Sequence, residues 1–322
     1  MQIFITGASG FIGGAIARHL APEHRVRAMA RSERAAARVR ATGAEPVHCD
    51  LAGIQAAHLA GCDTVIHCAA LVAPWGARAD FVQTNVTGTE NMLRAARAAG
   101  VRRFIHLGTE AALFRGQELV DIDESHPYPE RTPFLYSETK RDAEKRVLAA
   151  HESGIFHAVS LRPRLVWGPG DTTILPNLVA LVDRGAFRWI DRGKPLTSTT
   201  HIANLVAGVE AALTRGKGGT AYFITDDGTR TLREFLGQML VATGHSPGSR
   251  SVPGWLVRSV AWWAEALWKV LGRRTPPPVT RFSAAIVSVQ GTLRNHKAKR
   301  ELGYQPVISV AEGMAQLAAA GD

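Results

Sequence analysis

The stretch Thr6-Gly7-Ala8-Ser9-Gly10-Phe11-Ile12-Gly13 decides the fold. It directly follows an apolar run, 2–6, that is typical of a strand, and it opens a segment with helical periodicity. One glycine of such a triplet permits the tight turn, one lets the backbone approach a pyrophosphate, and one lets the helix pack against the strand. The helix N-terminus then offers free N–H groups and partial positive charge to the phosphates. The stretch therefore predicts a dinucleotide-binding site.

The composition is that of a large globular protein. The 322 residues are 46% hydrophobic and 20% charged, which suffices for one large domain or two smaller ones and excludes a disordered or fibrous chain. A net charge of +10 raises the question of a nucleic-acid partner. The arginines, however, are spread over predicted helices opposite alanine-rich faces, without the interleaved aromatic residues of a nucleic-acid groove. We therefore expect a solvated basic surface and no nucleic-acid partner.

The chain start and the cysteines indicate the compartment. The first strand begins at Gln2, so no charged-then-apolar secretion signal precedes the fold, and we expect a cytoplasmic protein. Cys49, Cys62 and Cys68 have neither the spacing of a zinc site nor the even count of a disulfide framework. They predict reduced thiols and no metal site.

Short runs rich in valine and isoleucine alternate with longer alanine-rich helical stretches, as expected of a parallel sheet covered on both faces. The predicted strands are 2–6, 26–30, 46–49, 64–67, 103–107 and 157–161. These units predict an α/β protein with a doubly wound parallel sheet, the Rossmann fold, over residues 1–166. Residues 167–322 are expected to form a smaller, discontinuous substrate domain, with 198–225 returning to the first domain through a strand at 221–224.

Residues 255–271 have the periodicity of an amphipathic helix. The stretch contains Trp255, Trp262, Trp263 and Trp268, more tryptophans than one packed face needs, and it is a poor membrane span because it is short and carries three charges. Four interpretations stay open: packing on its own domain, membrane-surface contact, a dimer face, and the lid of an apolar pocket.

The end of the second strand bears on the choice of cofactor. An enzyme limited to NAD usually has an acidic residue there for the ribose 2′-OH, and none is present. Arg31 and Ser32 instead provide a cation and a hydroxyl suited to a 2′-phosphate. The sequence thus favours NADP(H) over NAD(H).

Tyr136 and Lys140 lie four residues apart, after Thr132-Pro133, which predicts a capped helix beginning at Pro133. A free tyrosine has a pKa near ~10 and is a poor acid or base at neutral pH. Lowering that pKa to near ~7 needs roughly 4 kcal/mol of phenolate stabilisation, for which the lysine ammonium and an oxidised nicotinamide are available sources. Thr109, after the strand at 103–107, adds a hydroxyl. These three residues form the candidate catalytic group.

In its motifs the sequence resembles the extended short-chain dehydrogenase/reductase family, within the NAD-dependent epimerase/dehydratase superfamily. The resemblance spans nearly the whole chain and departs from the family where Gly108-Thr109 replaces a common Ser-Ser. The matching segments are the glycine loop, Cys49-Asp50-Leu51, His67-Cys68-Ala69-Ala70, Asn85-Val86-Thr87-Gly88-Thr89, the Tyr136/Lys140 pair, Arg162-Pro163 leading to Gly168-Pro169-Gly170-Asp171, and Leu302-Gly303-Tyr304-Gln305-Pro306.

The resemblance implies roles for individual residues. Tyr136 is the acid in reduction and the base in oxidation, Lys140 binds the nicotinamide ribose and lowers the tyrosine pKa, and the Thr109 hydroxyl holds the substrate oxygen. Asp50 bonds the adenine amino group and Leu51 lines its pocket. The full set of residues expected at the cofactor is Gly7, Ser9, Gly10, Phe11, Ile12, Gly13, Arg31, Ser32, Asp50, Leu51, Ala69, Ala70, Asn85, Tyr136, Lys140 and Pro163.

The resemblance is strongest to the branch of 3β-hydroxysteroid dehydrogenases and 2-alkyl-3-oxoalkanoate reductases. It implies interconversion of a ketone and a secondary alcohol on a large apolar substrate, either steroid-like or a long-chain 3-oxo acid. Five aromatic residues are expected to wall the pocket: Trp189, Trp255, Trp262, Trp263 and Phe282.

Two other functions stay open. A nucleotide-sugar epimerase or dehydratase uses the same hydride step and would need cations such as Arg184, Arg188 and Arg192 for a diphosphate. A non-catalytic NAD(P)-binding regulator is the other, although such proteins typically lack the tyrosine and lysine kept here. The family further implies a homodimer formed by the helices near 85–99 and 131–150.

Overall fold

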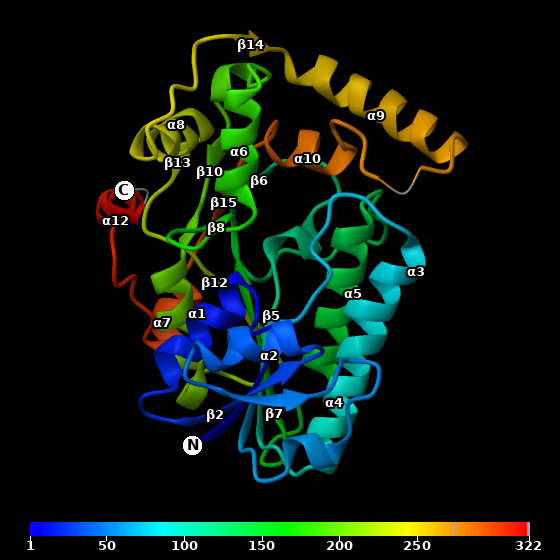
Figure 1. The fold of residues 1–322 in the computed structure, drawn as a ribbon, viewed down its shortest axis with the longest axis vertical. Helices are drawn as coiled ribbons and strands as arrows, with labels where there is room; N and C mark the ends of the chain where they lie inside the picture. The colour runs from blue at the N-terminus through cyan, green and yellow to red at the C-terminus, as the bar shows by residue number, and fades with distance from the viewer. Residues whose placement is uncertain (274, 321–322) are drawn as a thin grey trace.

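A seven-stranded parallel sheet forms the centre of the molecule in the computed structural model, which describes residues 1–273 and 275–320 (Figure 1). The strand order is β12-β7-β5-β4-β1-β2-β3. The strands are β1 Gln2–Thr6, β2 Arg25–Ala30, β3 Glu45–His48, β4 Thr64–His67, β5 Arg103–Leu107, β7 His157–Pro163 and β12 Thr220–Ile224. The predicted Rossmann fold is confirmed, and the run at 221–224 does pair with the sheet, in parallel to β7.

Alternating side chains give the sheet two apolar faces, and each face carries its own core. Ile3 and Ile5 of β1 point to one face, whereas Phe4 points to the other. Helices from between the strands cover both faces, as a doubly wound sheet requires. The first face packs against α1 Phe11–Leu20, α2 Glu33–Arg40, α7 Ile202–Thr214 and α11 His296–Leu302; the second packs against α4 Gly88–Ala98 and α5 Leu135–Ala149.

The strand order reverses between β1 and β4, so the loops after these two strands diverge and leave a crevice outside their carboxyl ends. The glycine loop follows β1, and the segment 68–77 follows β4. A short helix, α3 Arg78–Phe81, and a π-helical segment, η2 Val82–Thr87, lead from there into α4. This edge of the sheet is where a nucleotide is expected to bind.

A smaller layer of short strands and helices stands above that edge (Figure 1). Its four-stranded sheet has the order β13-β10-β15-β6, and β6 comes from between β5 and α5, so the first half of the chain contributes a strand to this layer. Its elements are β6 Leu119–Ile122, β8 Val166–Trp167, α6 Ile174–Asp183, β9 Trp189–Ile190, β10 Leu196–Thr197, β11 Thr200–His201, β13 Arg230–Thr231, α8 Leu232–Ala242, β14 Ser251–Val252, α9 Gly254–Val270, α10 Arg281–Ile286, β15 Gly291–Leu293 and α12 Val310–Ala320, with a 3₁₀ turn at η4 Asp191–Gly193. Two further 3₁₀ turns connect elements of the central sheet: η1 Ala56–Leu59 lies between β3 and β4 and packs on α4, and η3 Glu110–Leu113 follows β5.

Two predicted helices can be compared with the structure: one begins later than predicted, and the other is present as predicted. Helix α5 begins at Leu135 and not at Pro133; Phe134 is its N-cap, and the Thr132 hydroxyl instead donates to the Phe114 carbonyl at 2.9 Å. The helix predicted at 255–271 is present as α9, at the outer end of the smaller layer (Figure 1). Among the described residues, no helix combines the length and the apolar content needed to cross a membrane.

Candidate active site

The glycine loop makes a tight turn that brings α1 close to the end of β1. Gly7 has a φ of +74°, and a Cβ there would lie 3.0 Å from the Ala69 backbone nitrogen. A Cβ on Gly13 would lie 2.5 Å from the Gly7 carbonyl oxygen, so only glycine permits this helix–loop contact. A Cβ on Gly10 would contact only the Gly7 oxygen, at 3.4 Å. The packing of the chain itself therefore does not require glycine at position 10.

The start of α1 fits a pyrophosphate. Gly10 is its N-cap, no side chain caps it, and the helix carries no acidic residue in its first turn. Its first N–H groups therefore lack an intrahelical acceptor and a competing carboxylate. Ser9, Phe11 and Ile12 are partly buried in the same turn. A phosphate group can approach this backbone without displacing a side chain.

The ends of β2 and β3 carry the residues expected at the adenosine end of the cofactor. Arg31 is exposed directly after β2, and the Ser32 hydroxyl caps α2 by accepting a backbone N–H at 3.3 Å. The Asp50 carboxylate accepts the Gly53 N–H at 2.7 Å, which holds it in a turn. Leu51 packs beside α4. These side chains line the same carboxyl edge of the sheet as the glycine loop.

Asn85 joins the loop after β4 to helix α5. Its amide oxygen accepts the Leu71 N–H at 2.7 Å, and its amide nitrogen donates to the Leu71 carbonyl and to the Thr139 hydroxyl, both at 3.1 Å. Asn85 is buried, and its side chain forms these hydrogen bonds with other residues of the protein. It therefore positions Ala69 and Ala70, which precede Leu71 in this loop, relative to the helix of Tyr136.

Lys140 is buried one helical turn after Tyr136. Its ammonium group donates to the Leu107 carbonyl at 2.7 Å and lies 3.4 Å from His106 Nε2. Burial lowers the lysine pKa to about 8, with the Glu144 and Cys68 side chains acting in the opposite direction. Burial and the nearby ammonium group likewise keep the pKa of His106 well below its usual value. At the end of β5, the ammonium group of Lys140 thus lies next to the neutral imidazole of His106.

Thr109 and Glu110 form a hydrogen-bonded pair at the start of the 3₁₀ turn η3. The Thr109 hydroxyl donates to Glu110 Oε2 at 2.8 Å, and Glu110 Oε1 accepts from Arg164 Nη1 at 2.7 Å. All three residues are buried. Glu110 does not face solvent; it is buried against Arg164. The 54-residue separation of this pair left no local sequence signal.

Gly108, where the family commonly has serine, is explained by a buried carboxylate. A Cβ on Gly108 would lie 2.5 Å from Ser160 Oγ and 2.6 Å from Glu144 Oε1. Glu144 of α5 is fully buried and accepts from Ser160, Tyr128 and the Arg162 guanidinium group of β7, just before Pro163. This network fastens α5 to the sheet, so the backbone at Gly108 can lie against the pair only without a side chain.

Tyr136 lines a small hollow whose other lining residues are mostly apolar. The Phe282 ring of α10 meets the Tyr136 ring edge-on, with centroids 5.7 Å apart. Burial raises the pKa of Tyr136 above its ordinary value, the Glu110 charge raises it further, and contact with the Thr109 hydroxyl lowers it. The phenol is therefore protonated throughout the neutral pH range. The hollow is lined by Ala73, Pro74, Trp75, Gly76, Phe81, Pro133, Phe134, Leu135, Tyr136, Glu265, Lys269 and Phe282.

The aromatic wall differs from the one predicted. Of the five residues expected there, only Phe282 lines the hollow, whereas Trp189 is buried elsewhere and Trp255, Trp262 and Trp263 are exposed on α9. Composition alone could not separate tryptophans that face a pocket from those that face solvent. Sequence reasoning also missed Trp75, which could have been found because it lies in the loop after β4, at the edge where the site forms.

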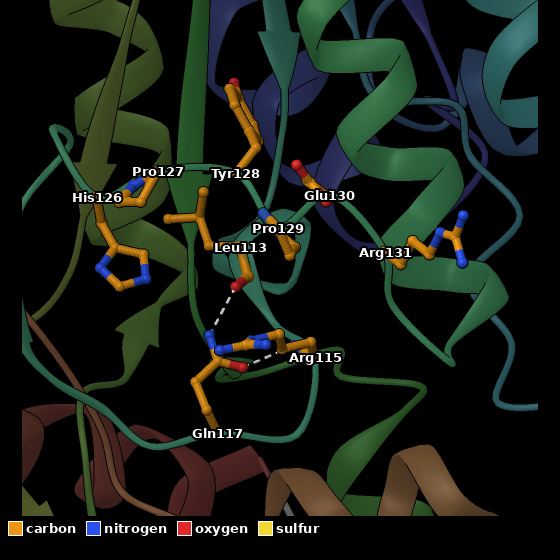
Figure 2. Close-up of a pocket in the computed structure, with 9 residues that line it drawn as sticks. All are labelled: Leu113, Arg115, Gln117, His126, Pro127, Tyr128, Pro129, Glu130 and Arg131. Atoms are coloured by element: carbon orange, nitrogen blue, oxygen red, sulfur yellow. Dashed lines mark hydrogen bonds between the residues drawn. The ribbon is translucent and has the colours of Figure 1, made fainter.

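A second hollow, of about 480 Å³, lies away from Tyr136 and is shown in Figure 2. It is lined by Leu113, Arg115, Gln117 and residues 126–131. The Gln117 amide accepts the Arg115 N–H at 2.8 Å and donates to the Leu113 carbonyl at 2.9 Å, so these three lining residues are hydrogen-bonded to one another (Figure 2). None of the predicted catalytic or cofactor residues lines it.

Comparison with known proteins agrees with the geometry. Residues 3–225 match the model of the NAD dependent epimerase/dehydratase family. The chain is 40% identical, over all its length and 97% of the relative, to 4-hydroxy-2-methyl-3-oxo-4-farnesyl-3,4-dihydroquinoline-1-oxide ketoreductase of Stigmatella aurantiaca. It is 34% identical to 2-alkyl-3-oxoalkanoate reductase of Stenotrophomonas maltophilia, over 99% of both chains. It is 30% identical to 3-beta-hydroxysteroid dehydrogenase of Mycolicibacterium neoaurum, over 98% of this chain and 90% of the relative.

Among solved structures, the crystal structure of gox2253 superposes with a TM-score of 0.80 at 27% identity, covering 99% of this chain and 97% of that one. The predicted resemblance to the branch of hydroxysteroid dehydrogenases and oxoalkanoate reductases is thereby confirmed. The chain belongs to the NAD dependent epimerase/dehydratase family, the extended short-chain dehydrogenases/reductases, and is an NAD(P)-dependent oxidoreductase.

Proposed function

We propose that this protein is an NADPH-dependent reductase of ketones that carry a large apolar body, either steroid-like or a long-chain 3-oxo acid. The observation that carries the proposal is the position of Tyr136, in a hollow walled by Trp75, Phe81, Phe134 and Phe282. A polar reacting group among aromatic side chains suits a substrate whose carbonyl is its main polar feature. The names of the three relatives describe a farnesyl, an alkyl and a steroid compound, which supports the same class.

Tyr136 is the proton donor in this proposal. Its raised pKa keeps the phenol protonated at neutral pH, the form that an acid needs when a carbonyl oxygen becomes an alcohol. The Thr109 hydroxyl lies beside Tyr136 and positions the same carbonyl oxygen once its proton turns from Glu110 Oε2 to the substrate. Lys140, held by the Leu107 carbonyl, lies one turn away and stabilises the phenolate left after proton transfer. When bound, the nicotinamide supplies the hydride.

The preference for NADP(H) rests on Arg31 and Ser32. Arg31 is exposed beyond the end of β2 and takes part in none of the ion pairs between described residues, so its guanidinium group is available to a 2′-phosphate. Arg31→Asp should reverse the preference, measured as the ratio of kcat/KM with NADPH to kcat/KM with NADH. Arg34→Asp, on the exposed side of α2, is the matched control for charge. An unchanged ratio in Arg31→Asp would remove this assignment.

The decisive experiment is a screen of NADPH oxidation with steroid ketones, long-chain 3-oxo acids and nucleotide sugars. Stoichiometric NADPH oxidation with an apolar ketone supports the proposal. Isomerisation of a nucleotide sugar with the cofactor retained would overturn it in favour of an epimerase; none of Arg184, Arg188 and Arg192 lines the hollow. Tyr136→Phe should abolish the reduction, and retained hydride transfer in that variant would refute the role of Tyr136.

We also infer a homodimer, on the family resemblance, through α4 and α5, which pack side by side at the surface. Light scattering of the full chain measures the mass, and a monomer at micromolar concentration contradicts the inference.

A further inference from the structure

Helix α9 exposes its apolar face instead of burying it. Leu256, Val260, Trp263, Leu267 and Val270 recur at intervals of three and four residues and so share one face. Their exposed fractions are 40%, 50%, 69%, 52% and 85%, and the neighbouring Trp255, Trp262 and Leu271 are exposed by 64%, 48% and 53%. Half of the large apolar side chains that are exposed within the described residues lie in this one segment. Such a concentration marks an interaction surface.

The opposite face of α9 fixes how the helix lies. Ala261 is fully buried, and the Glu265 carboxylate accepts the Arg281 N–H of α10 at 2.6 Å. Helices α9 and α10 pack together at the outer end of the molecule (Figure 1). The apolar residues named above stay exposed in this packing. The face is therefore presented outward by a packed and hydrogen-bonded element.

The same helix borders the hollow of Tyr136. Glu265 and Lys269 of α9 line that hollow, together with Trp75 and Phe282. The Trp75 indole N–H donates to the Arg273 carbonyl at 3.4 Å, which ties the loop after β4 to the chain just beyond α9. Whatever α9 docks on is thereby brought next to the mouth of the candidate active site.

We propose that α9 is an interfacial helix that lays its apolar face into the surface of an anionic phospholipid membrane, so that the Tyr136 hollow receives its apolar ketone from the lipid. This proposal rests on the proposed function for its substrate class. Tryptophan is the residue that membrane–water interfaces favour most, and α9 with its flanks is rich in it. Since no described helix can cross a membrane, α9 is expected to lie on the surface.

Charge favours an anionic lipid over a second copy of the chain. Arg258, Lys269 and Arg273 are exposed on or just after α9, and its only acidic residue, Glu265, is turned toward α10. Arg258 lies seven residues before Glu265 and Lys269 four residues after it, so both lie on the polar face of α9, where cations add attraction to anionic headgroups. A second copy of this chain is itself basic, with a net charge of +10, and offers these cations no matching anionic surface.

The test measures co-sedimentation of the full chain with vesicles of phosphatidylcholine alone or mixed with phosphatidylserine. The test variant is Val260→Glu/Trp263→Glu/Leu267→Glu. The matched control, Ile155→Glu/Val241→Glu/Val307→Glu, places three acidic residues at sites that are 63%, 66% and 66% exposed away from α9. We expect wild type and control to bind the mixed vesicles and to be released by salt, and the α9 variant to lose at least tenfold in binding.

Three outcomes would overturn the proposal: no binding of wild type to mixed vesicles, equal binding by the α9 variant, or loss of a dimer in the α9 variant with no vesicle binding in wild type. The last outcome assigns the face to a second copy. Activity separates this proposal from the proposed function. The α9 variant should reduce a water-soluble short-chain 3-oxo ester at the wild-type rate and lose at least tenfold on a steroid ketone held in vesicles. If no ketone is reduced in any form, the proposed function fails while the vesicle result stands.

Discussion

Burial of the Lys140 ammonium group should make the stability of the protein depend on pH in a specific direction. The pKa of Lys140 is lowered from 10.5 to about 8 in the folded protein. Below pH 8 both folded and unfolded chains carry the ammonium, and the cost of burying it is fully present. Between the two pKa values the unfolded chain binds more protons, so stability rises with pH. From pH 7 to pH 10 the gain from this one group is about 2–3 kcal/mol.

Lys140→Met removes the titrating group and with it the gain. We expect urea unfolding to show that the free energy of unfolding of wild type increases by about 2–3 kcal/mol relative to Lys140→Met between pH 7 and pH 10. The comparison of variants cancels the titration of other residues. Lys145→Met, an exposed lysine on the same helix, is the control and should show no such divergence. A constant difference between wild type and Lys140→Met, or a decrease with pH, would refute a buried charged lysine.

Two further predictions concern the neighbours of Tyr136. Glu110→Gln removes a charge that raises the pKa of Tyr136, so the pH at which kcat/KM for alcohol oxidation reaches half its maximum should move down, and an upward move would contradict the assignment. Gly108→Ala would place a methyl group 2.6 Å from Glu144 Oε1 and should cost about 1–3 kcal/mol in urea unfolding. Gly237→Ala on α8, where the nearest atom is 4.0 Å away, is its control and should not destabilise; equal stability of the two variants would refute the steric argument.

The central sheet could be predicted from sequence because its signal is local. Each strand is a short apolar run between glycine-rich or helical segments, and alternation within β1 already assigns Ile3 and Ile5 to one face and Phe4 to the other. The glycine loop could also be predicted, because the turn and the close contact between helix and loop each require glycine at a fixed position. The start of α5 was not, because Thr132 uses its hydroxyl on Phe114, a partner 18 residues earlier, and not on the helix.

Features that depend on distant segments could not be read in this way. Strand β6 pairs with β15 across some 170 residues, and the Glu110–Arg164 ion pair joins segments that no periodicity connects. The tryptophans illustrate the same limit. Their number predicted an unusual surface, but only the packing of α9 on α10 decides that Trp263 faces outward while Trp75, alone in its loop, lines the hollow.

The pKa shifts of Tyr136 and Lys140 bear on the direction of the reaction. Burial favours the neutral form of each group, which opposes the phenolate that alcohol oxidation needs as its base. Ketone reduction begins instead from the neutral phenol, the form that burial and the Glu110 charge both stabilise. Oxidation must therefore draw on an additional positive charge, such as that of an oxidised nicotinamide, before Tyr136 can ionise. Without cofactor the site thus holds Tyr136 as a proton donor, so the proposed reduction is the direction to assay first.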